Sequence, residues 1–312
     1  MKNSLLNCWW MKMLLFGVWI GGLLMAAEIV VRALCDPMPR MSEYIQAVDD
    51  PRGYALKPDS HAVFSGLKET LPEPVQYNIN MQGLREDGVA PLASLPGKLR
   101  IAAIGDSEVF GWSVNQQQTF QTLMEQMDDR LDVVNMGVPG YNAENVGCHA
   151  AIMLKRIPCH AVLYWFNPND FFSRKSTAFL KAPGKIKSEL LLRTIFYFDR
   201  CKESREKERR YSLEQVSRAK NGLLKLHRVC QDEHPPLFLV FSRPKDYEVL
   251  KNVPELKPVF VCCKVLFIDQ VITTFPRSDG HLSAEGHKAL AKFLYENAAQ
   301  PLLAQENLLS KF

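Results

Sequence analysis

The sequence lacks the cysteine and histidine patterns that are typical of a metal site. Its eight cysteines include no Cys-x-x-Cys pair, and none stands at a metal-ligand spacing from a histidine. We therefore expect neither a metal nor another cofactor. Cys262 and Cys263 stand in an apolar run and are expected to be small core residues. The eight are Cys8, Cys35, Cys148, Cys159, Cys201, Cys230, Cys262 and Cys263.

The chain also has little excess charge of either sign. Its 38 Lys and Arg against 34 Asp and Glu give a formal net charge of +4 and a pI near 8.5. This excess is too small to indicate a nucleic-acid partner, and none is expected. Basic residues gather between positions 200 and 210, but Glu203, Glu206 and Glu208 alternate with them. That mixture is typical of a solvated helix face or a linker.

One long apolar run is present, near the N-terminus. Residues 13–27 carry no charge, and apolar character continues to Leu34, interrupted only by Glu28 and Arg32. About 20 apolar residues suffice to cross the hydrocarbon core of a membrane. Glu28 and Arg32 are four positions apart, so a helix brings them together, and the long Arg32 side chain can reach the interface. The run predicts a transmembrane helix within residues 1–35.

The flanking charges predict the orientation of this helix. Lys2 and Lys12 precede the run, whereas acidic and basic residues are mixed after it, which favours the N-terminus inside and the remaining chain outside the cytoplasmic membrane, periplasmic or extracellular. A cleaved signal peptide is the alternative, because the uncharged core is short and ends at Ala27. We favour an uncleaved anchor. Leu34 is too bulky to precede a lipid-modified Cys35.

Beyond the apolar run, strand patterns alternate with helix patterns. This alternation predicts right-handed βαβ units, and hence an α/β fold with a parallel sheet covered on both faces. A hydrophobic content of 47% is ample for its core. Strands are expected at residues 99–104, 131–135, 161–166, 237–242 and 265–268, and helices at 120–127, 144–156, 213–231 and 284–297.

The same patterns divide the chain. Residues 1–35 form the anchor or signal segment, and residues 36–98, rich in Pro and Gly, form an irregular lead-in that packs on the folded domain. Residues 99–300 form the α/β domain and residues 301–312 a tail. Within the domain, residues 171–210 are rich in aromatic and charged residues and are expected to form a lid, which would shape the substrate pocket.

The most informative stretch is the first strand of this domain and the turn after it. The apolar run from Leu99 to Ile104 breaks into Gly105-Asp106-Ser107. A side chain just past the carboxyl end of a parallel strand lies where open α/β sheets bind their ligands. Ser107 is therefore a candidate nucleophile. The alternative is that these three residues only turn the chain.

Three distant loops also carry chemically useful groups. A strand ending near Asn135 runs into a loop with Gly137 and Gly140, and another runs into Asn169 and its neighbouring aspartate. His281 stands just before the last helix. Together with Ser107, these loops offer a hydroxyl, a backbone amide, a carboxamide and an imidazole.

In this order, Ser107, Gly140, Asn169 and His281 resemble the four residues that give the SGNH (GDSL-like) hydrolase superfamily its name. The resemblance covers roughly residues 99–294. Residues 77–85 also resemble the lead-in of membrane-anchored bacterial members. The resemblance implies a three-layer α/β/α sandwich with a flavodoxin-like sheet and ester hydrolysis through an acyl-enzyme.

Carried over to this chain, the resemblance assigns a role to each residue. Ser107 would attack the acyl carbonyl, and His281 would accept its proton and later donate it to the departing alcohol. The oxyanion hole would consist of the backbone N–H groups of Ser107 and Gly140 and the side-chain amide of Asn169. Gly137 is expected to be a turn glycine only.

The sequence departs from the family pattern in two places. Where most members have an aspartate three positions before the histidine, this chain has Ser278, and the nearest carboxylate is Asp279. We expect Asp279 to orient His281, with a backbone carbonyl as the alternative. Glu108 follows the nucleophile where the family name implies leucine, and it is expected to point away from the pocket. Asp106 is expected to brace the nucleophile loop by hydrogen bonds.

These residues predict a serine ester hydrolase that acts on acyl esters, in particular O-acetyl groups of carbohydrate outside the cytoplasmic membrane. An O-acyltransferase using the same site is an alternative, because it differs only in excluding water from the second step. A catalytically impaired relative that binds a glycan or a protein is another, prompted by Ser278 and Glu108. His287, six positions beyond His281, is expected to pack rather than catalyse.

Overall fold

The structure is a computed structural model. It describes residues 9–34, 43–64, 73–88, 96–172, 187–191, 193–195, 198, 211–233, 235–273, 277–278 and 281–305. Most of the predicted lid, 171–210, lies outside these residues, so the lid stays a prediction.

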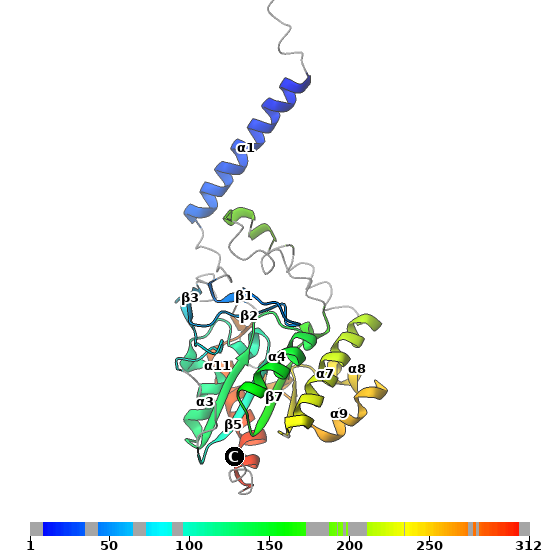
Figure 1. The fold of residues 1–312 in the computed structure, drawn as a ribbon. Helices are drawn as coiled ribbons and strands as arrows, with labels where there is room; N and C mark the ends of the chain where they lie inside the picture. Colours follow the sequence, from blue (N-terminus) through cyan, green and yellow to red (C-terminus); the bar gives the residue numbers. More distant parts are fainter. Residues whose placement is uncertain are drawn as a thin grey trace, which may run out of the picture.

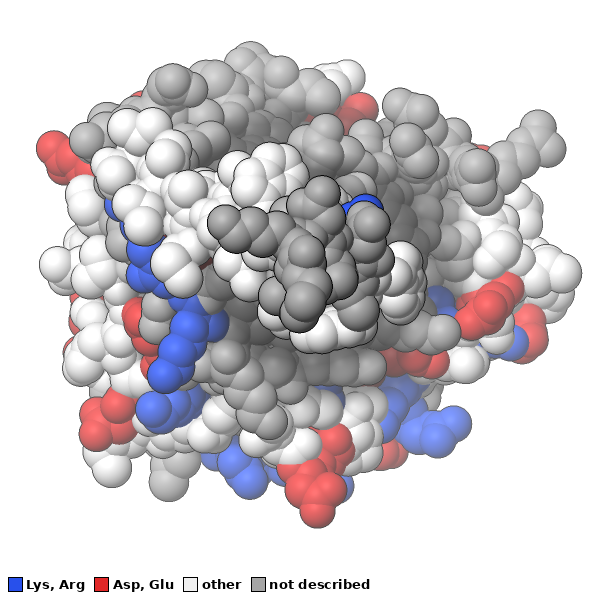
Figure 2. Space-filling view, turned by 90° about the horizontal axis from the view of Figure 1, so that it is seen from above, with Lys and Arg blue, Asp and Glu red and all other residues white. Residues whose placement is uncertain are grey.

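The N-terminal apolar run forms one helix, α1 (Trp9–Leu34), which projects from the rest of the molecule (Figure 1). None of its residues is buried, and it is long and apolar enough to cross a membrane. Arg32 Nε lies 2.7 Å from Glu28 Oε1, so the expected pairing of these two residues is confirmed. Figure 2 looks at the side of the domain from which α1 leaves and shows acidic and basic side chains mixed around its edge.

A five-stranded parallel sheet forms the centre of the domain. Its order is β6-β5-β7-β8-β9, the flavodoxin-like arrangement in which the first strand of the domain lies between the second and the third. The predicted α/β fold class is confirmed. The strands are β5 (Leu99–Gly105), β6 (Leu131–Gly137), β7 (Ala161–Phe166), β8 (Leu237–Phe241) and β9 (Lys264–Phe267).

Helices cover both faces of this sheet and create two cores. Because strand side chains alternate, Ile101 and Ala103 of β5 pack in one core with helices α3 and α11, while Ala102 and Ile104 pack in the other with α4 and α7. Figure 1 shows α4 and α7 side by side on one face of the sheet. The four helices are α3 (Phe120–Met127), α4 (Ala143–Arg156), α7 (Leu213–Glu233) and α11 (Ala284–Leu294).

Several short elements complete the domain. The helix expected at 284–297 is formed by α11 and a π-helical turn that directly follows it, η5 (Tyr295–Ala299). The others are η2 (Gln116–Gln118), η3 (Pro168–Phe171), α8 (Pro244–Lys251), η4 (Pro254–Leu256), α9 (Lys257–Cys262), α10 (Asp269–Thr273) and α12 (Gln300–Leu303).

The lead-in contributes two antiparallel strand pairs outside the central sheet: β1 (Ile45–Ala47) with β2 (Tyr54–Leu56), and β3 (Ser60–Phe64) with β4 (Val75–Ile79). It packs on the loop that follows β6, where the Tyr54 hydroxyl donates to the Pro139 carbonyl (3.3 Å) and the Tyr141 hydroxyl donates to the Tyr54 carbonyl (2.7 Å). The lead-in strands therefore lie at the carboxyl edge of the sheet, on the side of α1 (Figure 1).

The five cysteines within the described residues are free thiols. Cys159 and Cys230 are buried, but Cys262 is exposed at the end of α9 and Cys263 is half-buried. The expectation that Cys262 is a core residue is therefore wrong, because the apolar run around it forms a short surface helix instead of a buried strand. Cys8, Cys35 and Cys201 lie outside the described residues.

Candidate active site

The candidate nucleophile stands at a sharp turn between strand β5 and the short helix α2 (Ser107–Phe110). Asp106 is the N-cap of this helix, and its Oδ1 accepts a hydrogen bond from the Glu108 N–H (2.9 Å). Gly111 ends the helix in the left-handed conformation, at φ +82°. Ser107 is therefore held at the first helical position, half-buried at the carboxyl edge of the sheet.

Ser107 and His281, 174 residues apart in the sequence, meet at this edge. His281 Nε2 lies 2.9 Å from Ser107 Oγ, which is hydrogen-bond distance for a base beside its nucleophile. His281 lies on strand β11 (His281–Leu282), which pairs with β10 (Arg277–Ser278) just before helix α11. The centre of the Trp112 ring is 5.7 Å from the centre of the imidazole, so Trp112 packs against one side of His281.

The loop after strand β7 is tied directly to the nucleophile turn. Asn169 Nδ2 donates to Asp106 Oδ2 (2.5 Å), and Asn167 Nδ2 donates to Asp106 Oδ1 (3.1 Å). Asp106 thus fixes the orientation of the Asn169 amide, which agrees with the bracing role expected for it. The contribution of Asn167 was not foreseen, and its only signal in the sequence is its place at the end of β7.

The buried side chain of Asp170 also stabilises this loop. Its Oδ2 accepts from the Asn167 N–H (2.6 Å), and its Oδ1 accepts from the Tyr164 hydroxyl (2.7 Å). Burial raises the pKa of Tyr164 well above its ordinary value, so this hydroxyl stays a donor. Ser242 donates to Asn167 Oδ1 and accepts from the Trp165 indole N–H. Asp170 and Ser242, which follow β7 and β8, therefore hold Asn167 in place against Asp106.

The two glycines after strand β6 differ in their surroundings. A Cβ on Gly137 would meet the Phe110 backbone nitrogen at 2.2 Å, so only glycine lets α2 pack against β6 here. Gly140 has a φ of +91°, which favours glycine for its backbone conformation. The Val138 N–H between them bonds the Gly105 carbonyl (3.1 Å), so this loop begins beside the nucleophile turn. The oxyanion role of Gly140 stays a prediction.

The Glu108 carboxylate contacts the strand that carries His281. The side chain is buried, and its Oε2 accepts a hydrogen bond from the Leu282 N–H (3.2 Å). This agrees with the expectation that Glu108 points aside. It also shows a contact to the residue after His281 that the sequence could not reveal.

The other expected site residues have different outcomes. Asp279 lies outside the described residues, so its role stays a prediction. The backbone of Ser278 pairs with His281 in the β10–β11 ladder. His287 is buried, stacks on Phe120, and accepts from the Phe120 N–H through Nδ1 (3.3 Å). Burial lowers its pKa to about 3, which keeps it neutral. It packs, as expected.

Arg85 of the lead-in holds the end of the nucleophile helix. It is fully buried, and its guanidinium donates to the carbonyls of Phe110 (2.7 Å), Gly111 and Val114. The guanidinium also lies over the Tyr77 ring, 4.5 Å from its centre. Burial lowers the pKa of Arg85 to about 10, so it is still protonated at neutral pH. The lead-in is therefore part of the structure that positions Ser107.

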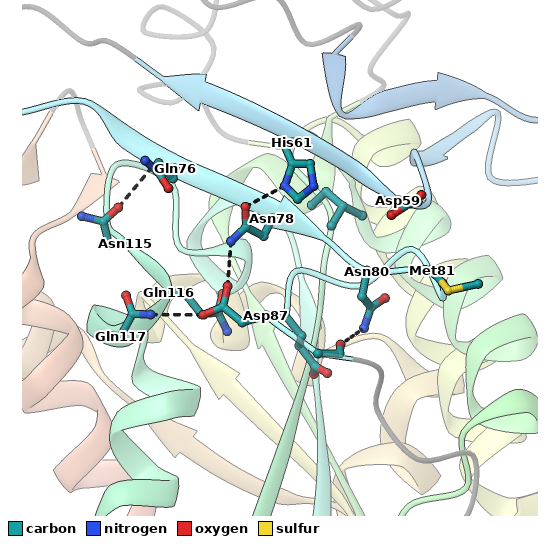
Figure 3. A pocket seen from close by; sticks show the side chains of 13 residues that line it. Asp59, His61, Gln76, Asn78, Asn80, Met81, Asp87, Asn115, Gln116 and Gln117 are labelled. Atoms are coloured by element: carbon teal, nitrogen blue, oxygen red, sulfur yellow. Dashed lines mark hydrogen bonds between the residues drawn. The ribbon is translucent and has the colours of Figure 1, made fainter.

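A polar pocket of about 400 Å³ lies between the lead-in and the segment after the nucleophile helix (Figure 3). Its side chains are bonded mainly to one another. Asp87 accepts from Asn78 (2.8 Å) and from Gln117 (3.1 Å), and Asn115 accepts from the Gln76 N–H (3.1 Å). These contacts attach the lead-in to the loop that follows α2. Within the described residues, no cluster of three His, Cys, Asp or Glu side chains could hold a metal.

No protein-family model and no curated protein matches the sequence. Among solved structures, the chain is similar to a lipolytic protein of the G-D-S-L family from Desulfitobacterium hafniense (14% identity, TM-score 0.41, 64% of this chain and 99% of that one). It is also similar to a carbohydrate acetylesterase from Sinorhizobium meliloti (15%, 0.44, 65% and 100%) and to a psychrotrophic esterase from Pseudoalteromonas sp. (11%, 0.44, 66% and 99%). At these identities the likeness concerns the fold alone.

Proposed function

We propose that this protein is a serine ester hydrolase of the SGNH type. The observation that carries the proposal is the 2.9 Å contact between Ser107 Oγ and His281 Nε2, made by residues far apart in the sequence. A serine becomes an effective nucleophile when an adjacent base can accept its proton. The proposal is supported by the position of both residues at the carboxyl edge of a parallel sheet, where α/β folds place their ligands.

In the proposed reaction, Ser107 Oγ attacks the ester carbonyl while His281 Nε2 accepts the hydroxyl proton. The negative charge that develops on the carbonyl oxygen is stabilised by the backbone N–H groups of Ser107 and Gly140 and by the Asn169 amide. His281 then donates its proton to the departing alcohol. Water, deprotonated by His281, attacks the acyl-enzyme, releases the acid and restores Ser107. Asp279 orients the imidazole during both steps.

We propose acyl esters on carbohydrate, in particular O-acetyl groups, as the substrate, and the outer side of the cytoplasmic membrane as the location. The apolar helix α1 supports a membrane anchor by its length and composition. The lysines before it and the mixed charges after it favour an external domain. A tethered domain on that side meets glycans and their esters.

The proposal is tested with the full chain in detergent. We expect a fluorophosphonate to label Ser107, and aryl esters of graded chain length to be hydrolysed, the acetate fastest. Ser107→Ala and His281→Ala should each remove nearly all of this activity and change the free energy of unfolding by no more than about 1–2 kcal/mol, because both side chains contribute little packing. An intact protein that neither labels nor hydrolyses any ester would contradict the proposal. A competing alcohol acceptor in the assay separates hydrolase from acyltransferase.

A further inference from the structure

The nucleophile stands between two buried carboxylates, and each of them reaches a different loop of the site. Asp106, 2% exposed, accepts hydrogen bonds from the amides of Asn167 and Asn169. Glu108, 7% exposed, accepts from the Leu282 N–H. The tripeptide at residues 106–108 therefore contacts both the proposed oxyanion loop and the strand that carries His281.

The Glu108 contact is directed at a backbone group that needs a partner. Leu282 is fully buried, and a buried N–H without an acceptor destabilises the folded state because it has lost its hydrogen bonds to water. Leu282 directly follows His281 in the chain, so a hydrogen bond that holds the Leu282 N–H also limits movement of the His281 imidazole. Strand β11 has only two residues, so its own ladder gives it little rigidity.

Burying a carboxylate at this position costs free energy of hydration, so its presence indicates a functional or structural role. A buried carboxylate is stable only when hydrogen bonds replace its lost hydration. An apolar side chain would avoid that cost but could not accept from the Leu282 N–H. One turn of helix α2 thus carries both the nucleophile and the acceptor that holds strand β11. The positions of Ser107 Oγ and His281 Nε2 are therefore both set by helix α2.

We propose that Glu108 is a positioning residue for His281. Its Oε2 accepts the Leu282 N–H and thereby fixes the distance between the imidazole and Ser107 Oγ. The inference rests on the proposed hydrolase activity. A displacement of about 1 Å at a reacting group can lower a rate by about 100-fold. Loss of the acceptor should therefore slow the chemical step, while substrate binding stays nearly unchanged.

Three variants of the full chain in detergent separate the acceptor from other effects. Glu108→Gln keeps an acceptor oxygen at nearly the same place and removes the charge. Glu108→Leu removes the acceptor and fills the space with an apolar side chain. Glu108→Asp keeps the charge but draws the oxygens back by one methylene. For an aryl acetate, we expect kcat to fall about 10-fold to 100-fold in the Leu and Asp variants and less than about 3-fold in Gln, with KM within about 3-fold in all.

Glu125 provides a matched control. Its Oε1 accepts from the Val133 N–H (2.8 Å), the same kind of bond, but between helix α3 and strand β6. Glu125→Leu should lower the unfolding temperature and leave kcat unchanged, because no residue of the proposed site depends on that bond. The rate constant of Ser107 labelling by a fluorophosphonate should follow the order of kcat among the Glu108 variants.

The outcomes separate the inference from the function on which it rests. A wild-type chain without esterase activity contradicts the proposed function. An active wild type whose Leu and Asp variants keep its kcat contradicts the positioning role. A Gln variant that is as slow as Leu also contradicts it, because the acceptor oxygen would then be irrelevant. If Glu108→Leu does not fold, the comparison of Asp with Gln decides, because both keep a polar side chain with an oxygen acceptor and differ in its reach.

Discussion

At the residue scale, the proposed oxyanion hole depends on one amide whose direction is fixed by a carboxylate. Asn169 gives one amide hydrogen to Asp106, which leaves the other for the oxyanion. We predict that Asn169→Ala lowers kcat for an aryl acetate by about 100-fold or more, the usual effect of losing one preorganised donor. Steady-state kinetics measure this. Asn115→Ala, a remote amide of the polar pocket, is the control and should keep the wild-type kcat.

Glu86 gives a second prediction at this scale, concerning pH. Burial raises its pKa from 4.5 to about 8, although it accepts from the Asn135 N–H (3.1 Å). Between these two pH values the folded protein binds more protons than the unfolded chain, so this group makes the free energy of unfolding fall as pH rises. Glu86→Gln removes that dependence. Denaturant unfolding at pH 5 and pH 8 should show the variant gaining stability relative to wild type at the higher pH.

An equal difference at both pH values would contradict a raised pKa at Glu86. Glu255→Gln is the control. Its carboxylate is exposed and paired with Lys220, which holds the pKa of Glu255 below its ordinary value. That group is already mostly ionised at pH 5 in both the folded and the unfolded state, so the control should show little change between pH 5 and pH 8.

The sequence could predict the residues at strand ends but not the residues that act through a partner. The approach of Ser107 to His281 follows from two polar positions at the carboxyl edge of one sheet. The contact between Glu108 and Leu282 depends on how α2 and β11 are turned, which no periodicity encodes. Asn167 was missed for the same reason, because its partner Asp106 lies in the turn after another strand.

At the scale of elements, the lead-in reaches the nucleophile helix through Arg85. Three carbonyls at the end of α2 and just beyond it depend on this one guanidinium. We predict that Arg85→Met lowers the free energy of unfolding by about 3–5 kcal/mol, because buried carbonyls lose their donors at about 1–3 kcal/mol each. Denaturant unfolding followed by circular dichroism measures it.

Arg130→Met is the matched control for Arg85. Arg130 is exposed and bonded to Asp128, and solvent screens this ion pair, so its loss should change the free energy of unfolding little. If the two variants lose the same stability, the lead-in does not support the nucleophile helix as the contacts of Arg85 indicate.

The elements of the central sheet were predictable because each is a short apolar run that ends in polar residues. All five strands and the helices α3, α4, α7 and α11 appear within a few residues of their expected positions. The pairing of β1 with β2 and of β3 with β4 was not predictable, because three-residue to five-residue strands carry too few alternations. Helices α8 and α9, of eight and six residues, were missed; each has a proline in its first two positions, and proline is also favoured in turns.

At the scale of the whole molecule, helix α1 is long and apolar enough to cross a membrane. We predict that the full chain stays with membranes after extraction at alkaline pH, whereas a chain lacking residues 1–35 is released. The physical reason is the burial of about 20 apolar residues in the bilayer. Mass spectrometry of the membrane-bound protein should give the uncleaved chain. Release of a mature protein that begins near residue 28 would establish the signal peptide instead.

Helix α1 is also hydrogen-bonded to the segment at residues 187–191. The Glu28 carboxylate accepts from the Ser188 hydroxyl (2.8 Å) and from the N–H groups of Glu189 and Leu190 (both 2.9 Å), while it pairs with Arg32. An ionisable side chain in an apolar helix is destabilising unless it has a hydrogen-bond or ion-pair partner. These bonds provide such a partner.

This contact predicts slow amide exchange at a site far from the anchor in sequence. In the full chain, the amide hydrogens of Glu189 and Leu190 should exchange with solvent about 10-fold faster in Glu28→Ala than in wild type, because their acceptor is gone. Hydrogen–deuterium exchange with mass spectrometry measures this, and the amides of buried strand β5 serve as the unchanged reference. Equal exchange at residues 189 and 190 in both proteins would show that helix α1 and this segment are not joined through Glu28.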